Sequence, residues 1–143
     1  MNNNQTLQQG LELFQLKNTK YFSERVYTDR GEAFIKSHDI AHVVFGCDTT
    51  IYGEGVVKVW TTFGSNLSFW KVTTGYNEVN AFELSRAYSK GHVVKNILGF
   101  LWVIPKTIIR ARKMKKPWPF YDYEPYLDRP ISEIRREFNI VVL

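Results

Sequence analysis

Four ligand-type side chains occur close together in the chain, and their spacing restricts how this part of the protein can fold. His38 and His42 are four residues apart, so on an α-helix they lie one turn apart on the same face, where both can present a ring nitrogen to one ion. Asp39 lies one position further round the same helix. Glu54 follows Gly53 and other turn-forming residues, which end the first helix and let the chain turn back toward the histidines. The pattern therefore predicts two helices with a metal site between them.

The donor chemistry of these four side chains suits a divalent metal ion. Two imidazoles with one or two carboxylates favour zinc, although manganese, iron and nickel accept the same set, so the identity of the ion stays open. The alternative is a site without metal, in which Asp39 caps a helix or forms a salt bridge and Glu54 begins the next helix. Cys47 is a further soft donor, but a single cysteine is more often a small buried residue. Four candidate ligands in register favour the metal site.

The segment from His38 to Glu54, with Gly46 and Gly53 in place, resembles the signature of the ubiquinone (coenzyme Q) biosynthesis protein family of the Coq-four type. The resemblance spans about residues 22 to 140. The flanking similarity lies in two segments, residues 56–60 and 130–140. Only 37 residues precede His38, a shorter N-terminal region than family members typically have.

The resemblance implies a function for the chain. It implies a helical protein that holds a divalent metal through His38, Asp39, His42 and Glu54, binds a polyprenylated quinone precursor, and works in ubiquinone or prenylquinone biosynthesis. The family is associated with organising the ring-modifying enzymes at the membrane. A metal-dependent oxidative decarboxylation of a polyprenylated benzoate ring is the activity implied; a non-catalytic lipid-binding scaffold is the alternative.

Apolar spacing predicts an all-α fold in a single domain over residues 1–143, with residues 1–6 as a frayed end. We expect a bundle that contains a long kinked helix and, before the last helix, an extended segment rich in aromatic residues and proline. The helices are expected at about 7–14, from 23 or 29 to 45, 53–64, 78–116 with a kink or division at Pro105, and from Pro130 onward. The extended segment carries Trp118, Phe120, Tyr121, Tyr123 and Tyr126. The valines of residues 56–59 would also suit a strand.

The segment from Ile97 to Pro105 is apolar on every side, and its nine residues are fewer than the ~20 that a membrane-spanning helix needs. A central core helix is the favoured interpretation. The family resemblance implies a channel for a prenyl chain, whose candidate residues are Ile97, Leu98, Leu101, Trp102 and Ile104, although core packing explains these five equally well.

A cationic stretch from Lys106 to Lys116 follows, within a segment from Leu84 to Tyr121 that contains no acidic residue. Together with the net charge of +5, this stretch indicates contact with phosphates or with an anionic membrane surface. Its candidate anion-binding residues are Arg110, Arg112, Lys113, Lys115 and Lys116. No nucleic-acid-binding signature accompanies the charges, so no nucleic acid is expected as a partner.

Another class of function is a metal-dependent hydrolase. Asp39 stands where zinc proteases carry a glutamate base, and its shorter side chain disfavours that chemistry. A phosphohydrolase would need more ligands, and His92 is more easily explained as a surface or core residue.

The single cysteine and the lack of a visible presequence indicate a bacterial cytoplasmic protein that is peripheral on the inner membrane. An organellar form would be expected on the matrix side of the mitochondrial inner membrane. Other ubiquinone-biosynthesis enzymes and a homodimer are the partners considered.

Overall fold

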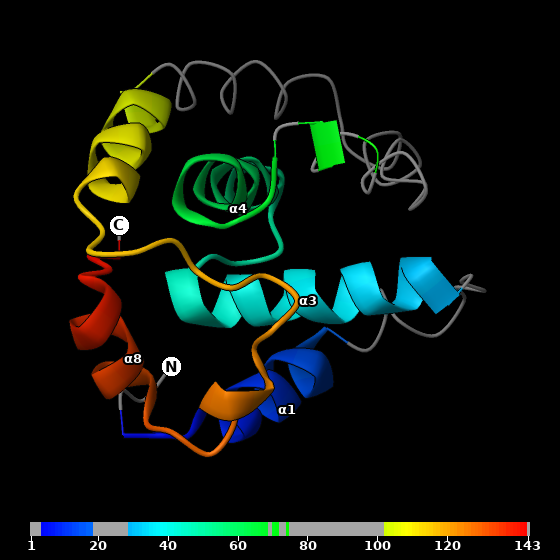
Figure 1. The fold of residues 1–143 in the computed structure, drawn as a ribbon. Coiled ribbons are helices and arrows are strands. Elements are labelled where there is room, and N and C mark those ends of the chain that lie inside the picture. Colours follow the sequence, from blue (N-terminus) through cyan, green and yellow to red (C-terminus); the bar gives the residue numbers. More distant parts are fainter. Residues whose placement is uncertain (1–3, 19–28, 69, 72–73, 75–101, 143) are drawn as a thin grey trace.

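The helices of the protein are arranged around one central helix (Figure 1). A computed structural model describes residues 4–18, 29–68, 70–71, 74 and 102–142. The helices for which bounds are defined are α1 (Leu7–Lys17), α3 (Asp29–Phe45), α4 (Ile51–Gly64), the 3-10 turn η1 (Glu124–Tyr126) and α8 (Ile131–Phe138). Residues 102–112 are also helical. The described part of the chain contains two isolated β-bridges and no strand, which confirms the all-α prediction.

The central helix is α3, which packs against α1, α4 and α8. Its second half is buried on nearly all sides, including Ile40, Val43 and Val44. Gly46 ends the helix with a φ of 70°, a left-handed conformation that glycine adopts without steric cost. Arg135 of α8 donates hydrogen bonds to the carbonyls of Val43 and Val44, at 2.9 Å each, and so satisfies the last turn of α3. The predicted end of this helix is confirmed.

The first helix, α1, is fixed at its N-terminus by a capping box. The Thr6 hydroxyl accepts a hydrogen bond from the Gln9 N–H, and the Thr6 N–H donates to the Gln9 side chain. The Gln5 carbonyl accepts a hydrogen bond from the N–H of Ile131, and Thr6 forms a β-bridge with Pro130. The interpretation of residues 1–6 as a frayed end is therefore wrong for Gln5 and Thr6.

The helix α4 begins two residues earlier than the glycine pattern predicts. Thr50 is the N-cap, and its hydroxyl accepts a hydrogen bond from the Gly53 N–H at 3.1 Å. On the buried side of the helix Trp60 stacks on Phe45 of α3, with ring centroids 4.8 Å apart and planes 5° from parallel. Helix rather than strand is thus the correct structure for the valine-rich residues 56–59.

Only the end of the long helix expected over residues 78–116 can be compared with the structure. Residues 78–101 lie outside the described residues, and the helix is observed over residues 102–112. Pro105 lies near the beginning of this observed part. Because proline has no N–H, it cannot donate to the carbonyl of residue 101, and residue 101 lies outside the described residues. The expected kink therefore stays a prediction. The end of this helix lies near the C-terminal end of α4, where Met114 and Ala111 approach Gly64.

The aromatic segment before α8 is extended as predicted, except at its end. The backbone N–H of Trp118 donates a hydrogen bond to the Gly64 carbonyl, and the Trp118 carbonyl accepts one from the Asn66 N–H. Tyr126 is an exception, because it lies in η1, a single 3-10 turn that begins at Glu124 and contains Pro125. Pro130 was expected in the first turn of the last helix and is its N-cap instead.

Candidate metal centre

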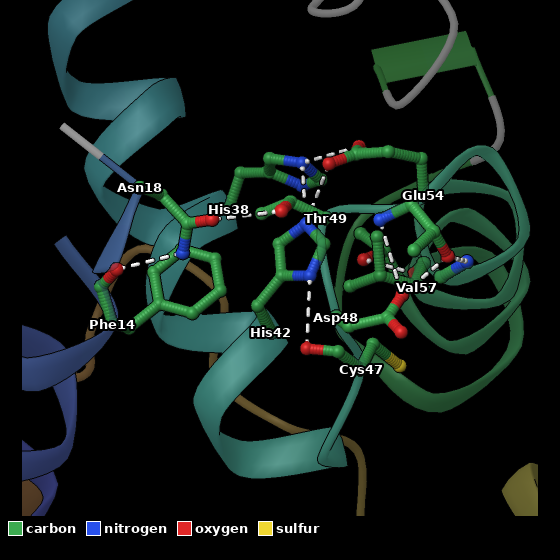
Figure 2. Close-up of polar contacts among 12 residues, drawn as sticks. Phe14, Asn18, His38, His42, Cys47, Asp48, Thr49, Glu54 and Val57 are labelled. Atoms are coloured by element: carbon green, nitrogen blue, oxygen red, sulfur yellow. Dashed lines mark hydrogen bonds and ion pairs between the residues drawn. The ribbon is translucent and has the colours of Figure 1, made fainter. Parts of the chain in front are cut away.

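Two histidines of α3 and one glutamate of α4 point toward a common centre (Figure 2). Nε2 of His38 lies 3.1 Å from Nε2 of His42. The Glu54 carboxylate spans both rings, with one oxygen 3.2 Å from Nε2 of His38 and the other 3.2 Å from Nε2 of His42. Within the described residues, this is the group of histidine, cysteine and acidic side chains whose donor atoms come close enough to hold one ion.

The spacing of these donor atoms fits a first-row divalent ion. Ligand atoms at ~2.05 Å from zinc, in a tetrahedron, are separated by about 3.3 Å. An octahedral ion with bonds of ~2.1 Å separates neighbouring ligands by about 3.0 Å. The observed 3.1–3.2 Å lies between these values. The spacing therefore accommodates zinc and the other candidate ions alike.

Burial controls the protonation of the cluster. His38 and His42 are 6% and 1% exposed. Burial, which outweighs the hydrogen bond to Glu54, lowers the pKa of His38 to about 4, so its imidazole is neutral at pH 7 and can offer a lone pair. Burial alone would raise the pKa of Glu54, but hydrogen bonds from the two histidines outweigh it and hold this pKa below its usual range. A neutral imidazole next to an ionised carboxylate is the protonation state that a metal ion requires.

The ring of His42 is held in orientation from two sides. Its Nδ1 lies 3.3 Å from the Cys47 carbonyl, and in the tautomer with the proton on Nδ1 this nitrogen donates to the carbonyl and Nε2 offers a lone pair to the centre. Phe14 of α1 stacks on the same ring, with centroids 5.1 Å apart and planes 25° from parallel. His38 is similarly flanked by Phe34, at 6.3 Å. Both ligand rings are therefore preorganised by their surroundings.

The loop between α3 and α4 places Glu54 opposite the histidines. Asp48 accepts a hydrogen bond from the Thr50 N–H, which forms a compact turn before the helix. Gly53 lies directly on this turn, and a Cβ at that position would collide with the Asp48 carbonyl and carboxylate. A glycine is therefore required one residue before Glu54. This close packing explains physically why glycine and glutamate are adjacent in the sequence.

Asp39, the fourth predicted ligand, does not join the three others in the structure. It is 5% exposed, and its carboxylate accepts a hydrogen bond from Nε2 of Gln15 on α1, at 3.3 Å. Cys47 is also not a member of the group: burial raises the pKa of its thiol to about 12, and its Sγ contacts the Phe45 carbonyl at 3.8 Å. The structure thus brings together His38, His42 and Glu54.

The proposed lipid and anion sites are described only in part. Ile97, Leu98 and Leu101 lie outside the described residues, as does His92. Trp102 is 72% exposed and Ile104 is half-buried, so this end of the apolar segment is not a core helix buried on every side.

Two residues of the basic stretch have partners inside the protein. Arg110 donates to the carbonyls of Val141 and Val142, and Lys116 pairs with Glu137 at 2.6 Å. The other three members, Arg112, Lys113 and Lys115, have exposed side chains. No helix within the described residues is long and apolar enough to cross a bilayer.

Lys58 also lies near the centre and is not among the residues predicted from the sequence. It lies one turn after Glu54 on α4 and is only partly exposed. Burial lowers its pKa, an effect that Glu54 opposes, and its charge also contributes to the low pKa of His38. The four-residue spacing from Glu54 is a signal that could have identified it. Phe14, which stacks on His42, lies on a different helix, so no residue spacing relates it to the site.

These features define a helical protein with a His/His/Glu cluster, its histidines buried and its glutamate partly exposed, that is suited to a divalent metal. Residues 30–143 match the protein family described as Coenzyme Q (ubiquinone) biosynthesis protein Coq4. The chain therefore belongs to this family, and the resemblance found in the sequence is confirmed. Comparison with curated proteins and with solved structures gave no significant match.

Proposed function

We propose that this protein binds a divalent metal, with zinc favoured, and a polyprenylated quinone precursor, and that it acts in ubiquinone biosynthesis. The observation that carries the proposal is the convergence of His38, His42 and Glu54 in a chain of the Coq4 family. The activity supported best is metal-assisted oxidative decarboxylation of a polyprenylated benzoate ring. Organisation of other pathway enzymes at the inner membrane is the second part of the proposal.

The residues around the centre are suited to an anionic aromatic substrate. A bound metal would supply Lewis acidity toward a ring carboxylate or the neighbouring phenol oxygen. The Lys58 ammonium, one turn from Glu54, adds positive charge on the α4 side of the site. Burial of both imidazoles keeps water from their rings and strengthens these electrostatic interactions. With a metal bound, the site would offer a partly desolvated, positively charged position for the head group of the substrate.

The test of the metal site is the metal content of protein purified without a nickel column. Plasma mass spectrometry is expected to find about one divalent ion per chain in the wild type and in Glu32→Ala, an exposed acidic residue of α3 that serves as the matched control. His42→Ala and Glu54→Ala are expected to lose the ion. A wild type that stays free of metal after reconstitution would refute the metal-dependent activity and leave the scaffold function.

Contact with an anionic membrane is proposed for the helix at residues 102–112. Trp102 is exposed, and Nζ of Lys106 lies 4.6 Å from the centre of its ring. A tryptophan combined with exposed basic residues is typical of helices that lie on anionic membranes. Trp102→Ala is expected to weaken sedimentation with vesicles containing anionic lipid, and Trp70→Ala, at an equally exposed tryptophan, is the control. Equal binding of the wild type to neutral vesicles would contradict this proposal.

A further inference from the structure

The helix α1 lies outside the family-matched residues 30–143, yet its C-terminal end contacts the surroundings of the metal centre at two places. Phe14 stacks on His42 of α3. The C-cap residue Asn18, one turn later, accepts a hydrogen bond from the Thr49 hydroxyl at 2.8 Å (Figure 2). Because Thr49 lies in the loop between α3 and α4, the end of α1 is connected both to a histidine of the centre and to the loop that leads to its glutamate.

The side chain of Asn18 uses both ends of its amide to make this connection. Its Nδ2 donates to the Phe14 carbonyl at 2.7 Å, and its Oδ1 accepts from the Thr49 hydroxyl. A backbone carbonyl can only accept, so the amide nitrogen faces Phe14 and the amide oxygen faces Thr49. The N–H of Asn18 also donates to the Gln15 carbonyl at 3.1 Å, which holds the residue at the helix end. Asn18 is therefore a bridge of defined direction from α1 to the loop.

The loop of residues 47–50 has this bridge as its anchor outside the two ligand-bearing helices. Among the described hydrogen bonds of the loop, the bond from Thr49 to Asn18 is the one that reaches an element other than α3 or α4. Two residues before Thr49, the Cys47 carbonyl lies 3.3 Å from Nδ1 of His42. A hydrogen bond that fixes Thr49 therefore also restricts the carbonyl that contacts the His42 ring.

We propose that Asn18 is a positioning residue of the metal centre. Through the Thr49 hydroxyl it holds the loop between α3 and α4, and so it fixes the ligands on either side of this loop, His42 and Glu54, relative to each other. The inference rests on the proposed metal-binding function. Thr50, the next residue in the loop, is the N-cap of α4, so the same anchor fixes the start of the helix that carries Glu54. Loss of such an outer contact typically weakens metal binding by about 10- to 100-fold.

The helix α1 is itself held in place, so it can serve as the fixed side of the bridge. Its apolar face packs against α3. At its N-terminus the N–H of Leu7 donates to the Arg129 carbonyl at 3.0 Å, which ties the helix to the segment before α8. At its C-terminal end Phe14 is 4% exposed. The side chain of Asn18 thus extends from a helix that is secured at both ends.

The test measures two properties of the full chain: its affinity for zinc, by competition with a chelator, and the visible spectrum of its Co²⁺ form, which reports ligand geometry. Thr49→Val removes the hydroxyl and keeps the branched shape, so it should weaken zinc binding by about tenfold and change the Co²⁺ spectrum. Thr49→Ser keeps the donor and should behave as the wild type. Thr107→Val is the matched control, because this buried hydroxyl donates to the Val103 carbonyl within its own helix, and it should also bind zinc as the wild type does.

A second substitution tests whether the two residues act through one hydrogen bond. Asn18→Ala removes the acceptor and should weaken zinc binding by at least the same factor as Thr49→Val. The double variant should bind zinc no more weakly than Asn18→Ala alone, because both substitutions break the same bond. Melting curves verify folding, and Asn18→Ala decides the test where Thr49→Val is unfolded.

The outcomes separate this inference from the proposed function. A wild type that binds no metal refutes the proposed function and removes the ground for the inference. If the wild type binds zinc, but folded Thr49→Val and Asn18→Ala bind it as tightly and give the same Co²⁺ spectrum, the inference about Asn18 is overturned while the metal site stands. Equal weakening by Thr107→Val, or losses that add up in the double variant, would also overturn it, because the effect would then come from general stability.

Discussion

The buried, neutral His38 predicts that the metal-free protein loses stability on mild acidification. Its pKa is about 4 in the folded protein and 6.5 in an unfolded chain, so between these pH values the unfolded state binds one more proton. Stability is therefore fully present above pH 6.5 and falls by about 1.36 kcal/mol for each pH unit below it. Over the whole interval the loss is about 3 kcal/mol, and between pH 6.5 and 5.0 it is about 2 kcal/mol.

The measurement is urea unfolding of chelator-treated protein, followed by circular dichroism at several pH values. With an m value of ~2 kcal/mol per M, the midpoint should fall by about 1 M between pH 6.5 and 5.0. The pKa of Glu54 is also held below its usual value, so a second loss should follow below pH 4.5, where the unfolded chain takes up that proton first.

The control for this prediction is His38→Gln, which removes the titrating ring and keeps a donor for Glu54. Its midpoint should change much less than that of the wild type between pH 6.5 and 5.0. The reasoning is refuted if the wild-type midpoint is the same at both pH values, or if His38→Gln retains the full dependence. In either case the burial of a neutral imidazole would not be the source of acid sensitivity.

Three further predictions concern the loop, the end of α3 and the metal. Gly53→Ala should destabilise the protein by about 1–3 kcal/mol and reduce metal content, because its Cβ would collide with Asp48, whereas Gly55→Ala, at a partly exposed position, should be neutral or stabilising in thermal melts. Arg135→Met should cost about 2–3 kcal/mol in urea unfolding, because the last carbonyls of α3 lose their donor, and exposed Arg136→Met should change stability by less than about 0.5 kcal/mol. Free zinc at 100 times its dissociation constant should stabilise the wild type by about 2.7 kcal/mol, a gain that chelator removes and that His42→Ala never shows.

Helices whose ends depend on local chemistry could be predicted from the sequence. Gly46 ends α3 because a left-handed residue is needed there, and this requirement is visible in the sequence. The glycine pattern predicts the start of α4 at Gly53, two residues too late, because it does not include Thr50 as the N-cap. The prediction fails at Thr6 for a different reason: its contact with Pro130 joins distant parts of the chain, and no local pattern reveals it.

The site could be predicted where its residues share a helix or a short connection. His38 and His42 are one turn apart, and the turn before Glu54 returns the chain to them, so periodicity and glycine placement identified all three. Asp39 accepts a hydrogen bond from Gln15, which lies 24 residues earlier and on another helix. Such a contact is decided by packing between helices, which spacing within one helix cannot specify.

The protonation of the cluster indicates what a bound cation would have to replace. Nε2 of His38 and Nε2 of His42 lie 3.1 Å apart, and each lies 3.2 Å from one oxygen of the Glu54 carboxylate. In the metal-free protein a neutral imidazole with its proton on Nε2 donates to that carboxylate, and such hydrogen bonds lower the pKa of Glu54. Burial lowers the pKa of His38 to about 4, so this ring does not hold a second proton at neutral pH. A divalent ion bound there would therefore take the place of these hydrogen bonds without first displacing a proton from an imidazolium of His38.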